Sequence, residues 1–211
     1  MYLSRVQLDL AKRKTLQAFY APNLFHGAAE QCFEGKRQRN LWRIDHLNGQ
    51  YYFLLLSDAM PNFESFCEQF GNGTNPETRN FQVLLDKIEK GDRWRFRLVA
   101  NPTNSLPAEK GKRGKVVAHI GVNHQKEWLL HKSQSGGFSL EPEEFQVTES
   151  RWFSFRKKAK DARITLLSVT YEGVLTVTDA KVFRETLLRG LGREKAYGMG
   201  LLTIACRERA K

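Results

Sequence analysis

The chain has 211 residues, of which 41% are hydrophobic and 27% are charged, so its length and composition suit one large or two small domains with packed cores. Lys and Arg number 34 against 23 Asp and Glu, which gives a formal net charge of +11. A surplus of this size favours a polyanionic partner: nucleic acid, an anionic membrane surface or an acidic protein. No apolar run in the sequence approaches the length that spans a bilayer, so we predict no membrane-spanning segment.

The N-terminal residues and the cysteines exclude two further classes. Asp9 interrupts the first apolar run and a basic cluster follows it, the reverse of the order in a signal peptide, so we expect a cytoplasmic protein. Cys32, Cys67 and Cys206 lie far apart, without the spacing of zinc ligands or of a disulfide framework, and we expect them to be small core residues. The sequence therefore predicts no metal and no cofactor.

The first hundred residues predict the element order strand, helix, hairpin, helix, strand. Alternation of apolar and polar residues indicates the strands, helical spacing of apolar residues indicates the helices, and Asn48-Gly49 is typical of a hairpin turn. The elements are a strand at 1–10, a helix at 24–33 capped at Asn23, strands at 40–47 and 50–58, a helix at 62–70 and a strand at 93–102 that Pro102 ends. This order is that of a βαββαβ ferredoxin-like unit.

The second half predicts the same plan again. A polar, basic, glycine-containing stretch at 103–115 reads as a linker between two domains, at 1–102 and 116–211. After it come a strand at 115–122, a helix at 123–134, strand-rich residues at 137–178, a helix at 180–189 and a strand at 200–205. We therefore predict an α+β protein of two tandem ferredoxin-like (RRM-like) domains, on element order alone.

Positive charge is concentrated between residues 151 and 163, a stretch that contains six Lys and Arg but only one acidic residue, Asp161. Aromatic residues precede this run and an alternating strand follows it, so we expect a hairpin with a basic tip. Such a ribbon lies against a nucleic-acid groove and neutralises phosphates without reading bases; the alternative is a solvated loop. The predicted RNA contacts are Arg156, Lys157, Lys158 and Lys160.

A second unusual segment, at 189–202, contains four glycines in eleven residues, with two cations between them. Glycine allows backbone amides to approach a phosphate closely, and successive N–H groups form an anion-binding concavity. The segment lies between a helix and a strand, so it does not match the dinucleotide-binding fingerprint. The predicted contacts are Gly190, Gly192, Arg193, Lys195, Gly198 and Gly200.

The letters "GLGREKAYGMGLLTIA", together with "MYLSR", "LWRID", "RWRFRLVANPT" and "GKRGKVV", run in order along nearly the whole chain. In these segments the chain resembles the CasE family, the CRISPR RNA-processing endoribonuclease of the Cascade complex. The resemblance implies two ferredoxin-like domains and binding of the repeat hairpin of precursor CRISPR RNA. It also implies cleavage at the 3′ base of the stem, retention of the product among the other Cascade subunits, and a monomer outside that complex.

The resemblance also implies cleavage without metal, by attack of a ribose 2′-OH on the adjacent phosphate. The family's catalytic histidine falls in the first helix, where this chain has His26. A histidine in the first helical turn stays neutral near pH 7 and suits a general base; the alternative is a histidine packed on a helix face. Some relatives carry a tyrosine three residues earlier, where this chain has Asn23, so Tyr20 is the candidate for a second catalytic group.

The sequence is compatible with two functions. One is the metal-independent endoribonuclease, and the other is a non-catalytic RNA-binding subunit of a CRISPR effector complex with the same fold. The remaining histidines, His46, His119, His124 and His131, are rivals to His26, and structural roles are expected for them. The two functions differ in whether His26 is needed for cleavage.

Overall fold

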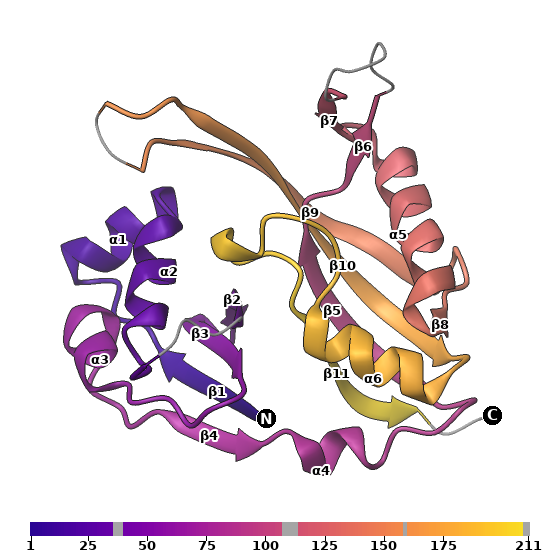
Figure 1. The fold of residues 1–211 in the computed structure, drawn as a ribbon, viewed down its shortest axis with the longest axis horizontal. Coiled ribbons are helices and arrows are strands. Elements are labelled where there is room, and N and C mark those ends of the chain that lie inside the picture. The colour runs from indigo at the N-terminus through magenta and orange to yellow at the C-terminus, as the bar shows by residue number, and fades with distance from the viewer. Residues whose placement is uncertain (36–39, 107–113, 158–159, 209–211) are drawn as a thin grey trace.

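A computed structural model describes residues 1–35, 40–106, 114–157 and 160–208 (Figure 1). The chain forms two αβ units, each built on an antiparallel sheet. Among the described residues, no helix has the length and apolar character that a membrane crossing needs.

The first sheet has the strand order β2-β3-β1-β4. Its strands are β1 (Tyr2–Gln7), β2 (Leu41–Leu47), β3 (Gln50–Ser57) and β4 (Glu77–Asn80), and its helices are α1 (Arg13–Tyr20), α2 (Asn23–Glu30) and α3 (Glu64–Phe70). The helices bury aromatic rings against the sheet, and Phe25 of α2 packs on Phe53 of β3 and Phe66 of α3. With helices after the first and third strands, this is the predicted ferredoxin-like unit. The hairpin turn is also confirmed, because Asn48 and Gly49 both have positive φ, 51° and 74°.

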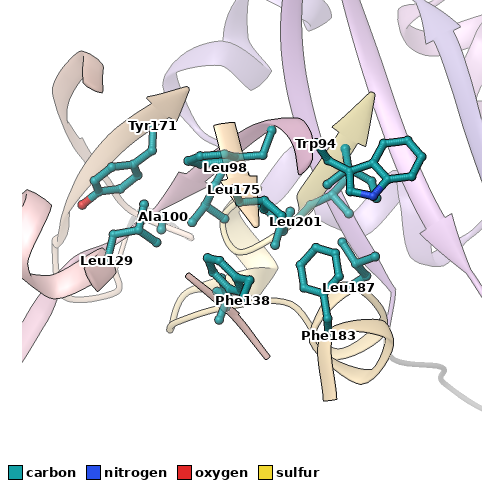
Figure 2. Close-up of a cluster of buried hydrophobic side chains, with 14 of the residues drawn as sticks. Trp94, Leu98, Ala100, Leu129, Phe138, Tyr171, Leu175, Phe183, Leu187 and Leu201 are labelled. Atoms are coloured by element: carbon teal, nitrogen blue, oxygen red, sulfur yellow. The ribbon is translucent and has the colours of Figure 1, made fainter. Parts of the chain in front are cut away.

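The second sheet has the order β11-β5-β10-β8, and β9 also pairs with β10. Its strands are β5 (Arg93–Ala100), β8 (Phe138–Ser139), β9 (Phe145–Phe155), β10 (Ile164–Val177) and β11 (Leu202–Glu208), with helices α5 (Val122–Gly136) and α6 (Ala180–Arg189). Leu129 of α5 and Phe183 of α6 lie in one buried cluster with Leu98 and Tyr171 of the sheet (Figure 2). The second ferredoxin-like unit is therefore present, with different boundaries from those predicted.

The prediction that the strand at 93–102 closes the first sheet is wrong. Leu98 of β5 pairs with Tyr171 of β10 on one side and with Leu202 of β11 on the other, so β5 opens the second unit. Its alternation predicts a half-buried strand correctly, but alternation does not identify the sheet to which a strand belongs. The first sheet is closed instead by β4, whose four polar residues give no apolar period.

The predicted linker at 103–115 and boundary at 116 consequently fall inside the second unit. β6 (Thr103–Ser105) pairs with β7 (Val116–Ala118) in a separate two-stranded ribbon, so the predicted strand at 115–122 shrinks to three residues. Residues 107–113 of the predicted linker lie outside the described residues. Between the sheets, α4 (Gln82–Leu85) connects β4 to β5.

The two units are joined by a buried arginine that no local sequence pattern indicates. Arg43 of β2 is 2% exposed. Its Nη1 donates to the carbonyl oxygens of Arg97 and Leu201, both at 2.9 Å, and its Nη2 donates to Asp45 Oδ2 at 2.7 Å and Thr203 Oγ1 at 2.9 Å. Because the first unit supplies this guanidinium and the second supplies most of its acceptors, the contact fixes the position of one unit against the other.

The cysteines match the prediction in part. Cys32 is buried, and burial raises the pKa of its thiol to about 12, so it is an inert core residue. Cys67 is half-buried and Cys206 is exposed, which contradicts the expectation for the latter. Cys206 lies at a register irregularity in β11 and has a φ of 51°, a distortion that sequence spacing does not report.

Candidate nucleic-acid interface and active site

The predicted basic hairpin is formed by β9 and β10, which pair from Phe155↔Ile164 down to Phe145↔Gly173. In Figure 1 the hairpin extends beyond the sheet as an arm whose β9 strand reaches α1. Arg156, Lys157 and Lys160 are exposed at its end, whereas Lys158 lies outside the described residues. The arm therefore presents positive charge to solvent, as the hairpin prediction requires.

The arm is anchored next to α2 through Tyr197. This residue ends the 3₁₀ helix η1 (Lys195–Tyr197), and its ring meets the Phe155 ring with centroids 5.2 Å apart. The Lys157 Nζ lies 5.6 Å from the centre of the same ring, a cation–π contact. Ala21, directly before α2, packs in the same small cluster as Phe155. The cationic arm, η1 and the start of α2 thus converge on one place.

His26 lies on α2, the helix where it was predicted. Pro22 rather than Asn23 occupies the N-cap position, and the His26 amide donates to the Pro22 carbonyl at 3.1 Å. The imidazole is 23% exposed, and its Nε2 lies 3.3 Å from Oε1 of Glu30 one turn later. A partly exposed imidazole beside a carboxylate has the arrangement of a histidine base with a group that orients it and stabilises its imidazolium form.

Tyr20 is not brought into contact with His26 by any described interaction. It is the last residue of α1, and its side chain is 80% exposed. It lines a groove between α1 and β9 together with Trp152, so it faces the arm. The sequence does not indicate where the Tyr20 side chain points, because its direction depends on the break between α1 and α2.

The glycine-rich segment packs against the protein itself. The amides of Gly190, Gly198 and Gly200 donate to the carbonyls of Thr186, Lys195 and Val99, so they are already paired within the protein, and their contact with RNA stays a prediction. All four glycines have positive φ, and those at 198 and 200 are buried. The segment instead holds η1, and with it Tyr197, in place.

The two cations of the segment have separate environments. Lys195 Nζ donates to the Gly192 carbonyl at 2.8 Å, which closes the loop on itself. Arg193 is exposed and lines a pocket of 620 Å³ with His119, His124 and His131. No group of His, Cys, Asp or Glu in the described part of the chain is arranged to hold a metal ion. His46 stacks on Tyr51 with ring centroids 4.5 Å apart.

Gly198→Val is expected to destabilise the protein severely, by about 3 kcal/mol or more, because two costs add. A Cβ at this position lies 2.7 Å from the Trp42 ring, and the φ of +79° is strained for a β-branched residue. Gly73→Val is the matched control: its φ is +90°, but no atom lies within 4 Å of the added Cβ. Thermal unfolding of both variants measures the cost of the clash as the difference between their losses of stability. Equal losses would contradict the tight packing on Trp42.

Comparison with known proteins places this arrangement in a family. The model of a family described as CRISPR associated protein matches residues 1–206. The chain belongs to this family. Cse3 of Thermus thermophilus, a CRISPR-associated endoribonuclease, is 29% identical to this CRISPR-associated chain over 220 residues, which cover 97% of the chain and 100% of the relative.

Two solved structures of such relatives carry RNA. A CRISPR endoribonuclease Cse3 bound to a 19-nucleotide RNA is 27% identical and superposes with a TM-score of 0.82, over 98% of this chain and 100% of that one. Thermus thermophilus Cse3 bound to an RNA representing a pre-cleavage complex is 28% identical and superposes with a TM-score of 0.81, over 97% of this chain and 98% of that one. The resemblance seen in the sequence is thus confirmed at the level of the family and of the whole fold.

Proposed function

We propose that this CRISPR-associated protein is an endoribonuclease that binds the repeat stem-loop of precursor CRISPR RNA and cleaves it 3′ of the stem. The relatives named as endoribonucleases and the net charge of +11 support the substrate class. The observation that carries the proposal is the set of contacts around Tyr197. This tyrosine belongs to η1, which contacts α2, the helix of His26 and Glu30. The cationic arm packs on the same tyrosine through Lys157.

The proposed chemistry follows from these groups. The His26 imidazole takes the 2′-proton as the 2′-oxygen attacks phosphorus, and the bond from phosphorus to the 5′-oxygen breaks, with solvent water supplying the proton of the leaving 5′-oxygen. The products are a 2′,3′-cyclic phosphate and a 5′-OH. Glu30, 3.3 Å from Nε2, orients the ring and stabilises the imidazolium that forms. Cations of the arm, Arg156, Lys157 and Lys160, offset the negative charge that develops on the phosphate. No step requires a metal ion.

The partners follow from the same proposal. After cleavage the stem stays bound to the protein, because the arm holds the duplex through phosphates that the reaction does not alter. The product-bound protein then joins the other Cascade subunits, and outside that complex it is a monomer. The second candidate function, a non-catalytic RNA-binding subunit, is favoured by the same arm but gives His26 and Glu30 no task.

Cleavage of a repeat RNA in excess EDTA decides between the two functions. The endoribonuclease releases one major product with a cyclic phosphate end and a 5′-OH fragment, with the same rate in EDTA and in Mg²⁺. Analysis of the fragment ends by mass spectrometry identifies both groups. Binding without cleavage under either condition would support the non-catalytic subunit, and cleavage that EDTA abolishes would contradict the metal-independent mechanism.

The arm is expected to supply much of the electrostatic part of the affinity. Replacing Arg156, Lys157, Lys158 and Lys160 by alanine together should weaken RNA binding and flatten its salt dependence, by roughly 0.7–0.9 log units of slope per lost phosphate contact. Filter binding across a salt series measures the slope. The matched comparison is the double variant at Arg156 and Lys157 against one at Lys181 and Arg189, two exposed cations on α6. An equal effect of the two pairs would mean that the arm has no special role.

A further inference from the structure

A groove between α1 and β9 is not used by the chemistry described above. It has a volume of 470 Å³, and its walls come from both units. The α1 wall includes Leu16 and Tyr20, and the β9 wall includes Arg151, Trp152, Phe153 and Ser154. The groove lies between β9 of the basic arm and residues of the first unit.

The groove exposes large apolar side chains that a monomeric protein usually buries. Tyr20 is 80% exposed, Trp152 49% and Leu16 47%. Two exposed aromatic residues facing one groove are unusual, because burying such rings contributes strongly to stability. Neither belongs to any of the three buried clusters of the described residues. These side chains therefore offer a contact surface that the fold itself leaves unoccupied.

The chemistry of the walls matches a nucleotide. Arg151 places its guanidinium 4.3 Å from the centre of the Phe153 ring and supplies a cation, and Ser154 supplies a hydroxyl. No carboxylate lines the groove among the described residues. Aromatic faces bind bases by stacking, and a nearby cation binds the phosphate of the same nucleotide. Bases inside a stem already stack on one another, so the ligand that fits is an unpaired nucleotide.

The position of the groove points to the same ligand. Trp152 of β9 precedes the exposed Arg156, the residue directly after the strand, by four residues, about 13 Å at the rise of a β-strand. The groove also shares Phe19, Tyr51 and Arg151 with a 250 Å³ cavity between the two units, so it is continuous with the inter-unit cleft. A stem held by the tip of the arm thus brings its single-stranded flank over the groove.

We propose that this groove is a stacking site for an unpaired nucleotide flanking the repeat stem, with Tyr20 and Trp152 as the stacking rings and Arg151 as the phosphate contact. The proposal rests on the RNA-binding function proposed above and assigns to Tyr20 a role in binding. It predicts that the protein recognises the junction between stem and single strand, not the stem alone.

The test compares two RNAs that cannot be cleaved because the scissile nucleotide is 2′-deoxy. One carries the stem-loop with its flanking unpaired nucleotides, and the other is the stem-loop alone. Tyr20→Ala and Trp152→Ala should each weaken binding of the flanked RNA by roughly 5- to 150-fold, the range found for the loss of one base–aromatic stack. Binding of the stem-loop alone should not change. Tyr20→Phe and Trp152→Phe keep a ring and should stay within about twofold of wild type.

A fluorescent 2-aminopurine in the flank gives a second reading. Its emission should be quenched on the wild-type protein and recover on Trp152→Ala. An equal loss of affinity for both RNAs, or no loss for either, overturns the proposal. If the alanine variants bind RNA normally but fail to assemble with the other Cascade subunits, the groove is a protein-docking surface instead, which also overturns it. Wild-type protein that binds neither RNA refutes the proposed function itself, whereas binding of both RNAs with equal affinity refutes only this inference.

Discussion

His26→Ala is expected to reduce the rate of RNA cleavage by roughly 10²- to 10⁴-fold, the usual contribution of a general base, while RNA affinity stays near that of wild type. The imidazole is 23% exposed, so its removal takes away the proposed proton acceptor without opening the core. Single-turnover cleavage of the repeat RNA measures the rate, and binding of the 2′-deoxy RNA measures the affinity separately.

Two further variants make this result specific. His131→Ala removes an exposed histidine from α5 and should leave cleavage unchanged. Glu30→Gln keeps the size of the side chain but loses the charge 3.3 Å from Nε2, so we expect a cleavage rate roughly tenfold lower with unchanged affinity, as for a positioning residue. If His26→Ala and His131→Ala cleave equally fast, His26 is not the base.

The fold was predictable from the sequence where a local pattern decides the structure. The hairpin turn at Asn48-Gly49 requires positive φ at two successive residues, and few sequences other than Asn-Gly accept that conformation. The helix after it follows the spacing of Phe63, Phe66 and Phe70, and α3 buries Phe66 and Phe70. In both cases neighbouring residues alone carry the information.

The sequence failed where pairing between distant segments decides the structure. The alternation of β5 identifies a strand, but only its pairing with β10 and β11, whose paired residues lie at least 69 positions away in the sequence, places it in the second sheet. The polar strand β4 gives no apolar alternation, because it lies at the edge of its sheet and none of its four residues is buried. The domain boundary follows from these two strands and was misplaced with them.

The candidate site divides in the same way. His26 and Glu30 are four residues apart on a helix, so their contact was open to prediction from spacing. The meeting of η1, the arm and α2 at Tyr197 joins residues from three distant segments, and no local pattern indicates it. The glycines were predicted to let the backbone approach a phosphate closely, but no local pattern indicated that Gly198 and Gly192 lie against the rings of Trp42 and Trp128.

Arg43→Ala is expected to lower the free energy of unfolding by about 3–5 kcal/mol, the usual cost of removing one partner from a buried ion pair. The substitution leaves the carbonyls of Arg97 and Leu201 without their donor at a place where the arginine is 2% exposed. It also leaves Asp45 with Arg97 as its remaining cation, since Arg97 Nε lies 3.2 Å from Asp45 Oδ1. Chemical denaturation of the RNA-free protein measures the loss.

The control is Arg5→Ala, which removes an arginine from an exposed ion pair with Glu77 in the same sheet. Solvent screens that pair, so its loss should change stability far less than the loss of Arg43. A functional consequence separates the two variants further. His26 belongs to the first unit and the arm to the second, so loosening the contact between units should slow cleavage in Arg43→Ala even at temperatures where the protein remains folded. Equal stability and equal cleavage in the two variants would mean that Arg43 does not hold the active site together.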